Sequence, residues 1–163
     1  EYNIRPEKKV IGNISRFESK KNQKFIVELF NEIVKKDKDY LLILGGTGDD
    51  SEIRALVKEN SLTESVIFIG PRNDVNLWYH IFNIYIMPSL YEGFGISAVE
   101  AQLSGCHVLA SDNIPKDTDI GGIEYINLND KKQWLNSFEK NKKSSISIPD
   151  YSNDVLKLVS YLK

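Results

Sequence analysis

The stretch PSLYEGFGISAVEAQLSG, residues 88–105, decides which fold this chain is expected to have. The run 84–87 directly before it is apolar and β-prone, which indicates a buried strand. Residues 96–103 have helical character, and Gly105 is placed to end that helix. Two glycines mark the turn between the strand and the helix. Elements in this order bring backbone N–H groups and a helix N-terminus up to an anionic ligand.

Two carboxylates bracket the turn, Glu92 within it and Glu100 inside the helix. Because a helix rises about 1.5 Å per residue, Glu100 lies more than one turn deep and faces a different part of a ligand than Glu92 does. Carboxylates do not bind phosphate, so we expect them to contact something attached to it, most naturally the hydroxyl groups of a sugar. The stretch therefore predicts a nucleotide-sugar site, with two ordinary solvated glutamates as the alternative.

The composition indicates one globular domain over residues 1–163 with a full-sized core. Hydrophobic residues make up 41% of the chain and charged residues 27%, which is typical of a folded protein rather than a disordered or membrane-spanning one. No apolar run approaches the roughly 20 residues that a membrane-spanning helix needs. The net charge of −2 offers no electrostatic reason to expect nucleic acid as a partner.

The single cysteine, Cys106, excludes an internal disulfide and fits a reducing cytoplasm. Cys106 and His107 open an apolar run, and His80 is the only other histidine, so we expect packed residues here rather than a nucleophile or a metal site. No signal peptide is visible. We expect a cytoplasmic protein, with any peripheral contact to the inner membrane face made through a further domain.

Strand and helix signals alternate along the chain, which predicts a parallel sheet with right-handed crossovers. The expected fold class is α/β, a doubly wound Rossmann-like sheet of about six strands with helices on both faces, over residues 10–145, followed by a terminal helix over residues 150–163. Ligands of such folds bind beyond the carboxyl ends of the strands, near the switch in strand order. The loops expected at that edge are residues 15–22, 45–49, 70–73, 88–95 and 111–119.

Two cations stand in the first of these loops, Arg16 directly after a strand and Lys21 just before a helix. A guanidinium fork and an ammonium group at such a junction suit a diphosphate. A solvated basic loop is the alternative. Because a parallel sheet brings both cations and both glutamates to one edge, a common site is favoured.

The spacing of Glu92 and Glu100 resembles the signature of retaining glycosyltransferases of family GT4, which have the GT-B fold. The loop from Ser15 to Lys21 also resembles that family's Gly-Arg-x-x-x-x-Lys motif, with Ser15 where the family has glycine. The resemblance runs from about Val10 to the C-terminus. It covers only the C-terminal, donor-binding half of a GT-B enzyme.

The resemblance implies a role for each of these residues. Glu92 would address the donor sugar, and Glu100 would hold the ribose hydroxyls. Arg16 and Lys21 would grip the donor diphosphate and neutralise it as the leaving group. The backbone amides that would assist Glu92 are those of Gly93, Phe94, Gly95 and Ile96.

The sequence GPR, residues 70–72, resembles the family's strand-end glycine loop, whose main chain reads the nucleobase. The resemblance implies that Pro71 and Arg72 line the base pocket, with Leu77 packing nearby; a plain loop between a strand and a helix is the alternative. The glycine-rich segment 45–48 permits close backbone approach but lacks the Gly-Lys-Ser/Thr of a P-loop.

Two Asp-x-Asp triplets, residues 37–39 and 117–119, have the pattern that binds a divalent metal in the other glycosyltransferase fold, GT-A. Neither matches a metal site of the GT-B family. The resemblance therefore implies no metal and no other cofactor.

The chain begins at Glu1 rather than at a methionine, and we expect a fragment or an excised domain. The expected function is that of the donor-binding domain of a group 1, GT4-like enzyme that transfers a hexosyl group with retention from a nucleotide-diphospho-sugar, most often a UDP-sugar in such families. The acceptor, a saccharide or lipid-linked saccharide in bacterial-type surface polysaccharide assembly, would bind a missing N-terminal domain. The chain alone is then expected to bind the donor but to transfer little.

Two other functions stay open at this point. A sugar-nucleotide 2-epimerase shares the GT-B architecture but needs acid and base groups at a sugar carbon, and the spacing of Glu92 and Glu100 favours transfer. A nucleotide-binding module without chemistry would bind the same ligands. The length of the parent open reading frame distinguishes that module from an enzyme with an acceptor domain.

Overall fold

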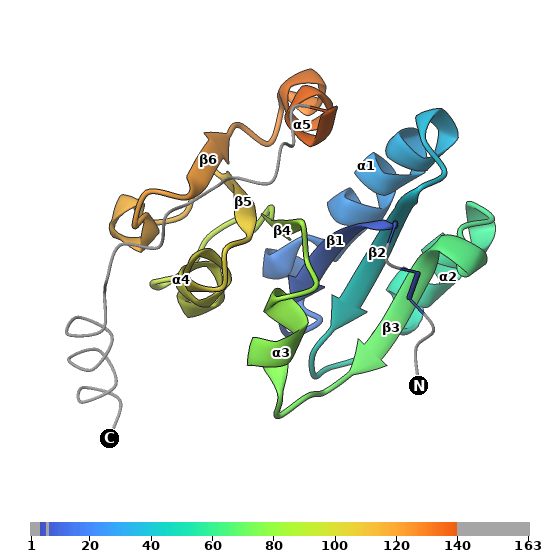
Figure 1. Ribbon diagram of the computed structural model, residues 1–163, viewed down its shortest axis with the longest axis horizontal. Coiled ribbons are helices and arrows are strands. Elements are labelled where there is room, and N and C mark those ends of the chain that lie inside the picture. The colour runs from blue at the N-terminus through green and yellow to red at the C-terminus, as the bar shows by residue number, and fades with distance from the viewer. Residues whose placement is uncertain (1–3, 6, 140–163) are drawn as a thin grey trace.

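Six parallel strands form one sheet in the order β3-β2-β1-β4-β5-β6 (Figure 1). The computed structural model describes residues 4, 5 and 7–139, and the helix expected over residues 150–163 lies outside these residues. This sheet confirms the α/β, Rossmann-like fold class. The strands are β1 (Lys9–Ile14), β2 (Tyr40–Gly45), β3 (Val66–Gly70), β4 (Ile84–Met87), β5 (His107–Ser111) and β6 (Ile123–Ile126).

Helices cover both faces of the sheet (Figure 1). One face carries α1 (Gln23–Lys36), α2 (Ser51–Glu59) and α5 (Lys131–Glu139), and the other carries α3 (Val75–Tyr79) and α4 (Ile96–Leu103). None of the helices in the described part of the chain has the length and apolarity that crossing a membrane requires. Among the described residues, three short 3-10 helices lie in the connections, at Ser19–Lys21, Thr63–Ser65 and Lys116–Thr118.

The buried strand β2 shows why the chain needs two helical layers. Its side chains point alternately to the two faces, as the pleat of a strand dictates. Leu42 and Leu44 belong to the core under α1 and α2, whereas Leu41 and Ile43 belong to the core under α3 and α4. All four are buried. A continuous apolar run of this kind is stable only when helices cover both faces of the sheet.

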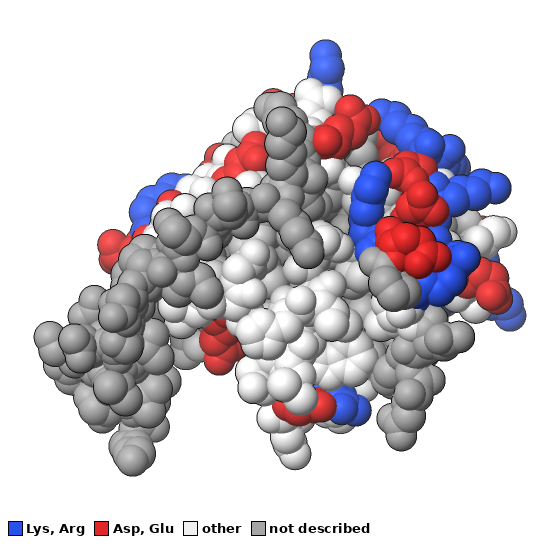
Figure 2. Space-filling model, viewed as in Figure 1, with Lys and Arg blue, Asp and Glu red and all other residues white. Residues whose placement is uncertain are grey.

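The short helix α3 leaves apolar surface uncovered. The spacing of Val75, Trp78 and Ile81 predicts three inward side chains, but Ile81 is 40% exposed, because α3 ends at Tyr79 and helical spacing does not extend past it. Leu77, on α3 itself, is 59% exposed. Figure 2 shows few charged side chains on the surface over α3.

A crevice begins where β1 and β4 separate. β1 pairs with β2 along its whole length, but it pairs with β4 only through Ile11 and Gly12. The strand order also reverses here, because β1 leads to β2 on one side and has β4 on the other. Ligands of doubly wound sheets bind at this point, outside the carboxyl ends of the strands.

Two buried polar side chains satisfy backbone groups at the separation. The Asn13 amide donates to the Ile86 carbonyl at 2.7 Å, and the Tyr85 hydroxyl donates to the Ile14 carbonyl at 3.0 Å. Buried carbonyl groups without a partner would be costly, so these side chains replace the ladder hydrogen bonds that the separating strands cannot make. The crevice is therefore a stable feature of the sheet.

The glycine-rich segment after β2 supports the loop that follows β1. A Cβ atom on Gly46 would lie 1.8 Å from the Ser15 carbonyl oxygen, and Gly46 has a φ of +138°. The Ser15 N–H donates to the Gly45 carbonyl at 2.9 Å, and the Phe17 N–H donates to the Thr47 carbonyl at 2.7 Å. The close approach that Gly46 permits is therefore to the chain itself.

We expect Gly46→Ala to destabilise the fold. Its backbone conformation alone costs a residue with a side chain about 1–3 kcal/mol, and the contact with backbone atoms adds to this. Urea denaturation measures the loss of unfolding free energy. Gly93→Ala is the matched control, because a Cβ atom on Gly93 would meet no heavy atom within 4 Å and the φ of Gly93 is not positive. Equal stability of the two variants would contradict the supporting role of Gly46.

Candidate functional site

A cleft of about 350 Å³ opens at the crevice between β1 and β4. It brings together the end of β1, the loop before α1, the glycine turn after β4 and the first residues of α4. Five of the residues predicted from the sequence line it, and three others join them. The predicted ones are Lys21, Glu92, Phe94, Gly95 and Ile96, and the others are Ile14, Ser15 and Ser97.

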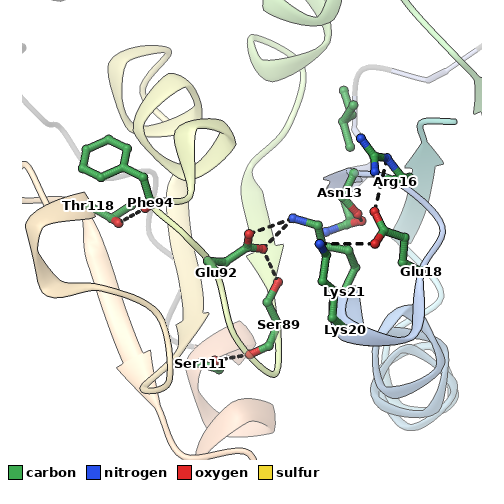
Figure 3. A network of polar contacts seen from close by, with 12 residues as sticks. Asn13, Arg16, Glu18, Lys20, Lys21, Ser89, Glu92, Phe94, Ser111 and Thr118 are labelled. Carbon is green, nitrogen blue, oxygen red and sulfur yellow. Dashed lines mark hydrogen bonds and ion pairs between the residues drawn. The ribbon is translucent and has the colours of Figure 1, made fainter.

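The centre of the site is an ion pair between Lys21 and Glu92. The Lys21 Nζ lies 2.7 Å from one carboxylate oxygen of Glu92 and 2.8 Å from the other. The two side chains are 17% and 9% exposed, so the pair is largely withdrawn from water. Figure 3 shows them pointing toward one another from the loops that follow β1 and β4. One predicted cation and one predicted acid therefore do meet in a single cleft.

Two serines hold Glu92 from behind. The Ser89 hydroxyl donates to Glu92 Oε1 at 2.7 Å, and the Ser111 hydroxyl donates to the Ser89 carbonyl at 2.5 Å (Figure 3). Ser89 is 1% exposed and Ser111 is fully buried. The chain of bonds links the last residue of β5 to the carboxylate, which fixes the orientation of Glu92 before any ligand arrives.

Direct contacts also join the two loops across the crevice. The Leu90 N–H donates to the Lys20 carbonyl at 2.8 Å, and the Asn22 side-chain amide donates to the Pro88 carbonyl at 3.1 Å. Asn22 has a φ of 59° and makes no side-chain capping bond, so its amide is used across the crevice rather than on helix α1. The cleft therefore has rigid walls.

The turn before α4 is held from the loop that follows β5. Gly95 precedes the helix with a φ of 86°, a conformation that favours glycine. The Thr118 hydroxyl donates to the Phe94 carbonyl (Figure 3). The backbone N–H groups of Ile96 and Ser97, at the start of α4, have no intrahelical acceptor and carry the positive end of the helix dipole. An anion in the cleft would meet these groups and Lys21 together.

Arg16 stands at the margin of the site. Its side chain is 66% exposed, and its Nε lies 3.2 Å from Glu18. Arg16 is not among the residues that line the cleft, although it is next to Ser15, which is. The structure thus places Arg16 beside the site without a contact to Lys21 or Glu92.

Glu100 lies further along α4. It is exposed and not part of the cleft lining, and its Oε2 accepts a hydrogen bond from the Tyr79 hydroxyl at 3.1 Å. Ile96 does line the cleft, and residues four apart share one side of a helix. Glu100 is therefore on the cleft side of α4, about one helical turn beyond the cleft.

The residues predicted for base recognition lie away from this cleft. Pro71 and Arg72 follow β3, which is separated from β4 by two strands. Arg72 forms a double hydrogen bond with Asp74 at 2.7 and 2.6 Å and lies 5.5 Å from the centre of the Trp78 ring. The hydrogen bond from Arg72 holds the pKa of Asp74 below its ordinary value. The role of Pro71 and Arg72 in base binding stays a prediction.

The Asp-x-Asp triplets have local structural roles. Asp37 pairs with Lys9 at 2.7 Å, near the start of β1 and so at the opposite edge of the sheet. Asp119 accepts backbone hydrogen bonds from Gly121, Gly122 and Ile123. Over residues 4, 5 and 7–139 there is no group of three or more His, Cys, Asp or Glu that could hold a metal ion.

Cys106 is a packed residue, as its sequence context predicts. It is fully buried, and its thiol donates to the Tyr79 carbonyl at 3.0 Å. Burial raises the pKa of Cys106 to about 12, so the unreactive thiol form persists at neutral pH. His107 lies 3.5 Å from Glu124, at the start of β5 and away from the cleft.

Sequence reasoning missed the residues that position the predicted ones. Ser89 and Ser111 could have been found from their place, because both lie at the carboxyl end of a predicted strand. Thr118 lies in the loop 111–119 expected at the same edge, but nothing in that loop singles it out, and Tyr79 contacts Glu100 from a helix that is distant in sequence. No local pattern marks a residue whose role depends on such a contact.

We expect Lys21→Met to destabilise the fold by about 1–3 kcal/mol, because it leaves the Glu92 carboxylate shielded from water without its cation. Urea denaturation measures the change in unfolding free energy. Lys20→Met is the matched control, since Lys20 pairs with Glu18 at 3.2 Å and is 33% exposed, and a surface pair contributes at most about 1 kcal/mol. If both variants lose the same stability, the Lys21–Glu92 pair contributes no more to the unfolding free energy than the Lys20–Glu18 pair does.

Comparison with known proteins agrees with the fold. The model of the family described as glycosyl transferases group 1 matches residues 1–145 of this chain. EpsF of Bacillus subtilis (strain 168), which carries the name of a glycosyltransferase, is 32% identical over 119 residues, 72% of this chain and 31% of EpsF. LpsB of Rhizobium meliloti (strain 1021), a lipopolysaccharide core biosynthesis mannosyltransferase, is 27% identical over 113 residues, 66% of this chain and 32% of LpsB.

Solved structures share the fold at lower identity. HepE of Anabaena, crystallised with UDP and glucose, superposes with a TM-score of 0.70 at 20% identity, over 85% of this chain and 41% of HepE. The chain spans about a third of the length of the curated relatives it matches. The match to the family model covers most of the chain, and the chain belongs to the glycosyl transferases group 1 family.

Proposed function

We propose that this chain is the donor-binding domain of a retaining, metal-independent glycosyltransferase whose donor is a nucleotide-diphospho-sugar, with UDP as its nucleotide. The observation that carries the proposal is the cleft at the crevice between β1 and β4, where Lys21, Glu92 and the start of α4 converge. A cation and a helix N-terminus suit a diphosphate, and a carboxylate beside them suits the hydroxyl groups of the attached sugar.

The Lys21 ammonium can contact Glu92 and a phosphate group at the same time. It has three N–H donors, and the contacts to Glu92 involve two carboxylate oxygens. The remaining donor is available to a phosphate oxygen in the cleft. Arg16 would add a guanidinium fork from the margin, because its contact with Glu18 engages Nε and leaves the terminal nitrogens. Both cations would stabilise the negative charge that develops on the leaving diphosphate.

Glu92 would orient the donor sugar, and its fixed geometry favours that role. Lys21 and Ser89 already hold its carboxylate, so little reorganisation is needed when a sugar arrives. The backbone amides from Gly93 to Ile96 would assist. Glu100 would take the ribose hydroxyls from its place one turn further along α4.

The named ligands of relatives support the donor class. HepE was crystallised with UDP and glucose, and LpsB is named as a mannosyltransferase of lipopolysaccharide core biosynthesis. We therefore infer a hexosyl donor and a saccharide or lipid-linked saccharide acceptor. Because the chain spans about a third of such relatives, the acceptor is assigned to a separate N-terminal domain of a cytoplasmic protein that works at the inner membrane face.

Titration calorimetry with UDP-glucose, GDP-mannose and ADP-glucose tests the donor site. We expect one donor to bind, and Arg16→Ala and Glu100→Ala each to weaken it about 10- to 100-fold, because each removes a charged hydrogen-bonding partner. EDTA is expected to leave the Kd unchanged, since no metal takes part.

Arg54→Ala and Glu139→Ala are the matched controls for this titration. Both residues form exposed ion pairs outside the cleft, Arg54 with Asp50 and Glu139 with Lys36. Neither control should change the Kd. If Arg16→Ala and Glu100→Ala leave every donor bound as tightly as the controls do, the site is wrongly assigned.

We expect the isolated chain to transfer sugar at least about 100-fold more slowly than its full-length parent, because no acceptor domain holds the second substrate in place. Release of the nucleoside diphosphate with a simple saccharide acceptor measures the rate. Robust transfer by the isolated chain would refute the assignment of donor binding and acceptor binding to separate domains. Donor binding without transfer by the full-length protein would point to a nucleotide-binding module instead.

A further inference from the structure

One side of the Glu100 carboxylate is already engaged by the protein. Its Oε2 accepts a hydrogen bond from the Tyr79 hydroxyl at 3.1 Å. Throughout the described ranges, 4, 5 and 7–139, no other hydrogen bond or ion pair reaches this carboxylate. Oε1 is therefore left for a ligand.

The position of Glu100 makes that ligand part of whatever occupies the cleft. Ile96 lines the cleft at the start of α4, and Glu100 follows it by four residues on the same side of the helix. Glu100 lies about 6 Å further along the axis, since a helix rises about 1.5 Å per residue. A group joined to a diphosphate in the cleft and extending along α4 would meet Oε1.

Packing holds the Tyr79 ring in one orientation, which directs its hydroxyl toward Glu100. The residue is 2% exposed. Its ring packs edge-on against Phe82 and Tyr85, with ring centres 6.1 and 5.5 Å away. Its carbonyl accepts the Cys106 thiol at 3.0 Å, which ties the end of α3 to the residues after α4. Tyr79 is thus a rigid donor, whereas an exposed glutamate alone would sample several rotamers.

The tyrosine also stays protonated. Burial, with smaller effects from Tyr85 and Glu100, raises the pKa of Tyr79 well above its ordinary value. The hydroxyl is therefore a hydrogen-bond donor at every pH at which the protein works, and Glu100 is its acceptor.

We propose that Tyr79 is a positioning residue for ribose recognition, whose hydroxyl fixes one oxygen of Glu100 so that the other faces the ribose hydroxyls of a nucleoside diphosphate in the cleft. The proposal rests on the proposed function, because it needs a nucleotide in that cleft. It adds a specific claim, that discrimination between ribose and a sugar without hydroxyls depends on a tyrosine from another helix.

The test compares nucleotides that differ only in the ribose. UDP, GDP and ADP, each with its 2′,3′-dideoxy analogue, are titrated into the wild-type chain and into Tyr79→Phe, which removes the hydroxyl and keeps the ring. For the base that binds, we expect Tyr79→Phe to weaken the ribonucleotide about 3- to 10-fold, the range for a lost hydrogen bond, and to leave the dideoxy analogue unchanged. In a Glu100→Ala background the same substitution should have no further effect, because the two residues act as one unit.

Tyr40→Phe is the matched control. Tyr40 is also buried, and its hydroxyl donates to the Phe138 carbonyl at 3.0 Å, at the start of β2 and far from the carboxyl edge of the sheet. Tyr40→Phe should change neither the affinity for the ribonucleotide nor that for the dideoxy analogue. Thermal melting checks that Tyr79→Phe and Tyr40→Phe both fold.

The possible outcomes distinguish a failure of the positioning role of Tyr79 from a failure of the proposed function. If the wild-type chain binds a ribonucleotide and Tyr79→Phe leaves its affinity intact, or weakens both forms equally, the positioning role is refuted and the donor site stands. If the wild-type chain binds none of the three ribonucleotides, the proposed function fails, and the role of Tyr79 fails with it.

Discussion

The pairing of β1 with β4 over only two residues is the constraint on which the rest of the site depends. β1 continues beside β2 to its end, but beyond Gly12 it has no partner strand on the side of β4. The sheet therefore opens at its carboxyl edge. Asn13 and Tyr85 stabilise this opening by satisfying the carbonyl groups that the missing ladder leaves. Every group proposed to contact the diphosphate or the sugar is arranged around that opening.

The residues of the site fall into two kinds according to how far the protein has fixed them. Lys21 and Glu92 are largely buried, bonded to each other and backed by Ser89, so their geometry is set before a ligand binds. Arg16 and Glu100 are exposed, at the margin of the cleft and along α4. In the proposed site, the buried pair would be rigid, Arg16 would adapt to the ligand, and the orientation of Glu100 would depend on Tyr79.

The two faces of the sheet contribute unequally to the candidate site. The face under α1, α2 and α5 buries a large apolar cluster that stabilises the domain. The face under α3 and α4 carries α4, whose start lines the cleft. On the same face, Tyr79 of α3 donates a hydrogen bond to Glu100. In the proposed site, the contact between α3 and α4 would link packing to ligand recognition. HepE of Anabaena shares the fold at low sequence identity.

The sequence alone determined the fold class and the edge at which the site lies. Alternating apolar runs and helical spacings specify a parallel sheet covered on both faces, and the carboxyl ends of parallel strands necessarily meet at one edge. The spacing of Glu92 and Glu100 identified the turn and helix that face the cleft. These inferences succeed because each depends on residues that are close in the chain.

Only the tertiary structure decided which predicted residues touch. It joined Lys21 to Glu92, left Arg16 with Glu18, and gave Glu100 a tyrosine partner. It also showed that Gly46 lets the backbone pack closely against Ser15. The physical reason is that such contacts depend on strand order and on how far β1 and β4 separate. No local sequence pattern encodes the strand order or the separation of β1 and β4, because both arise when strands that are distant in the chain pair.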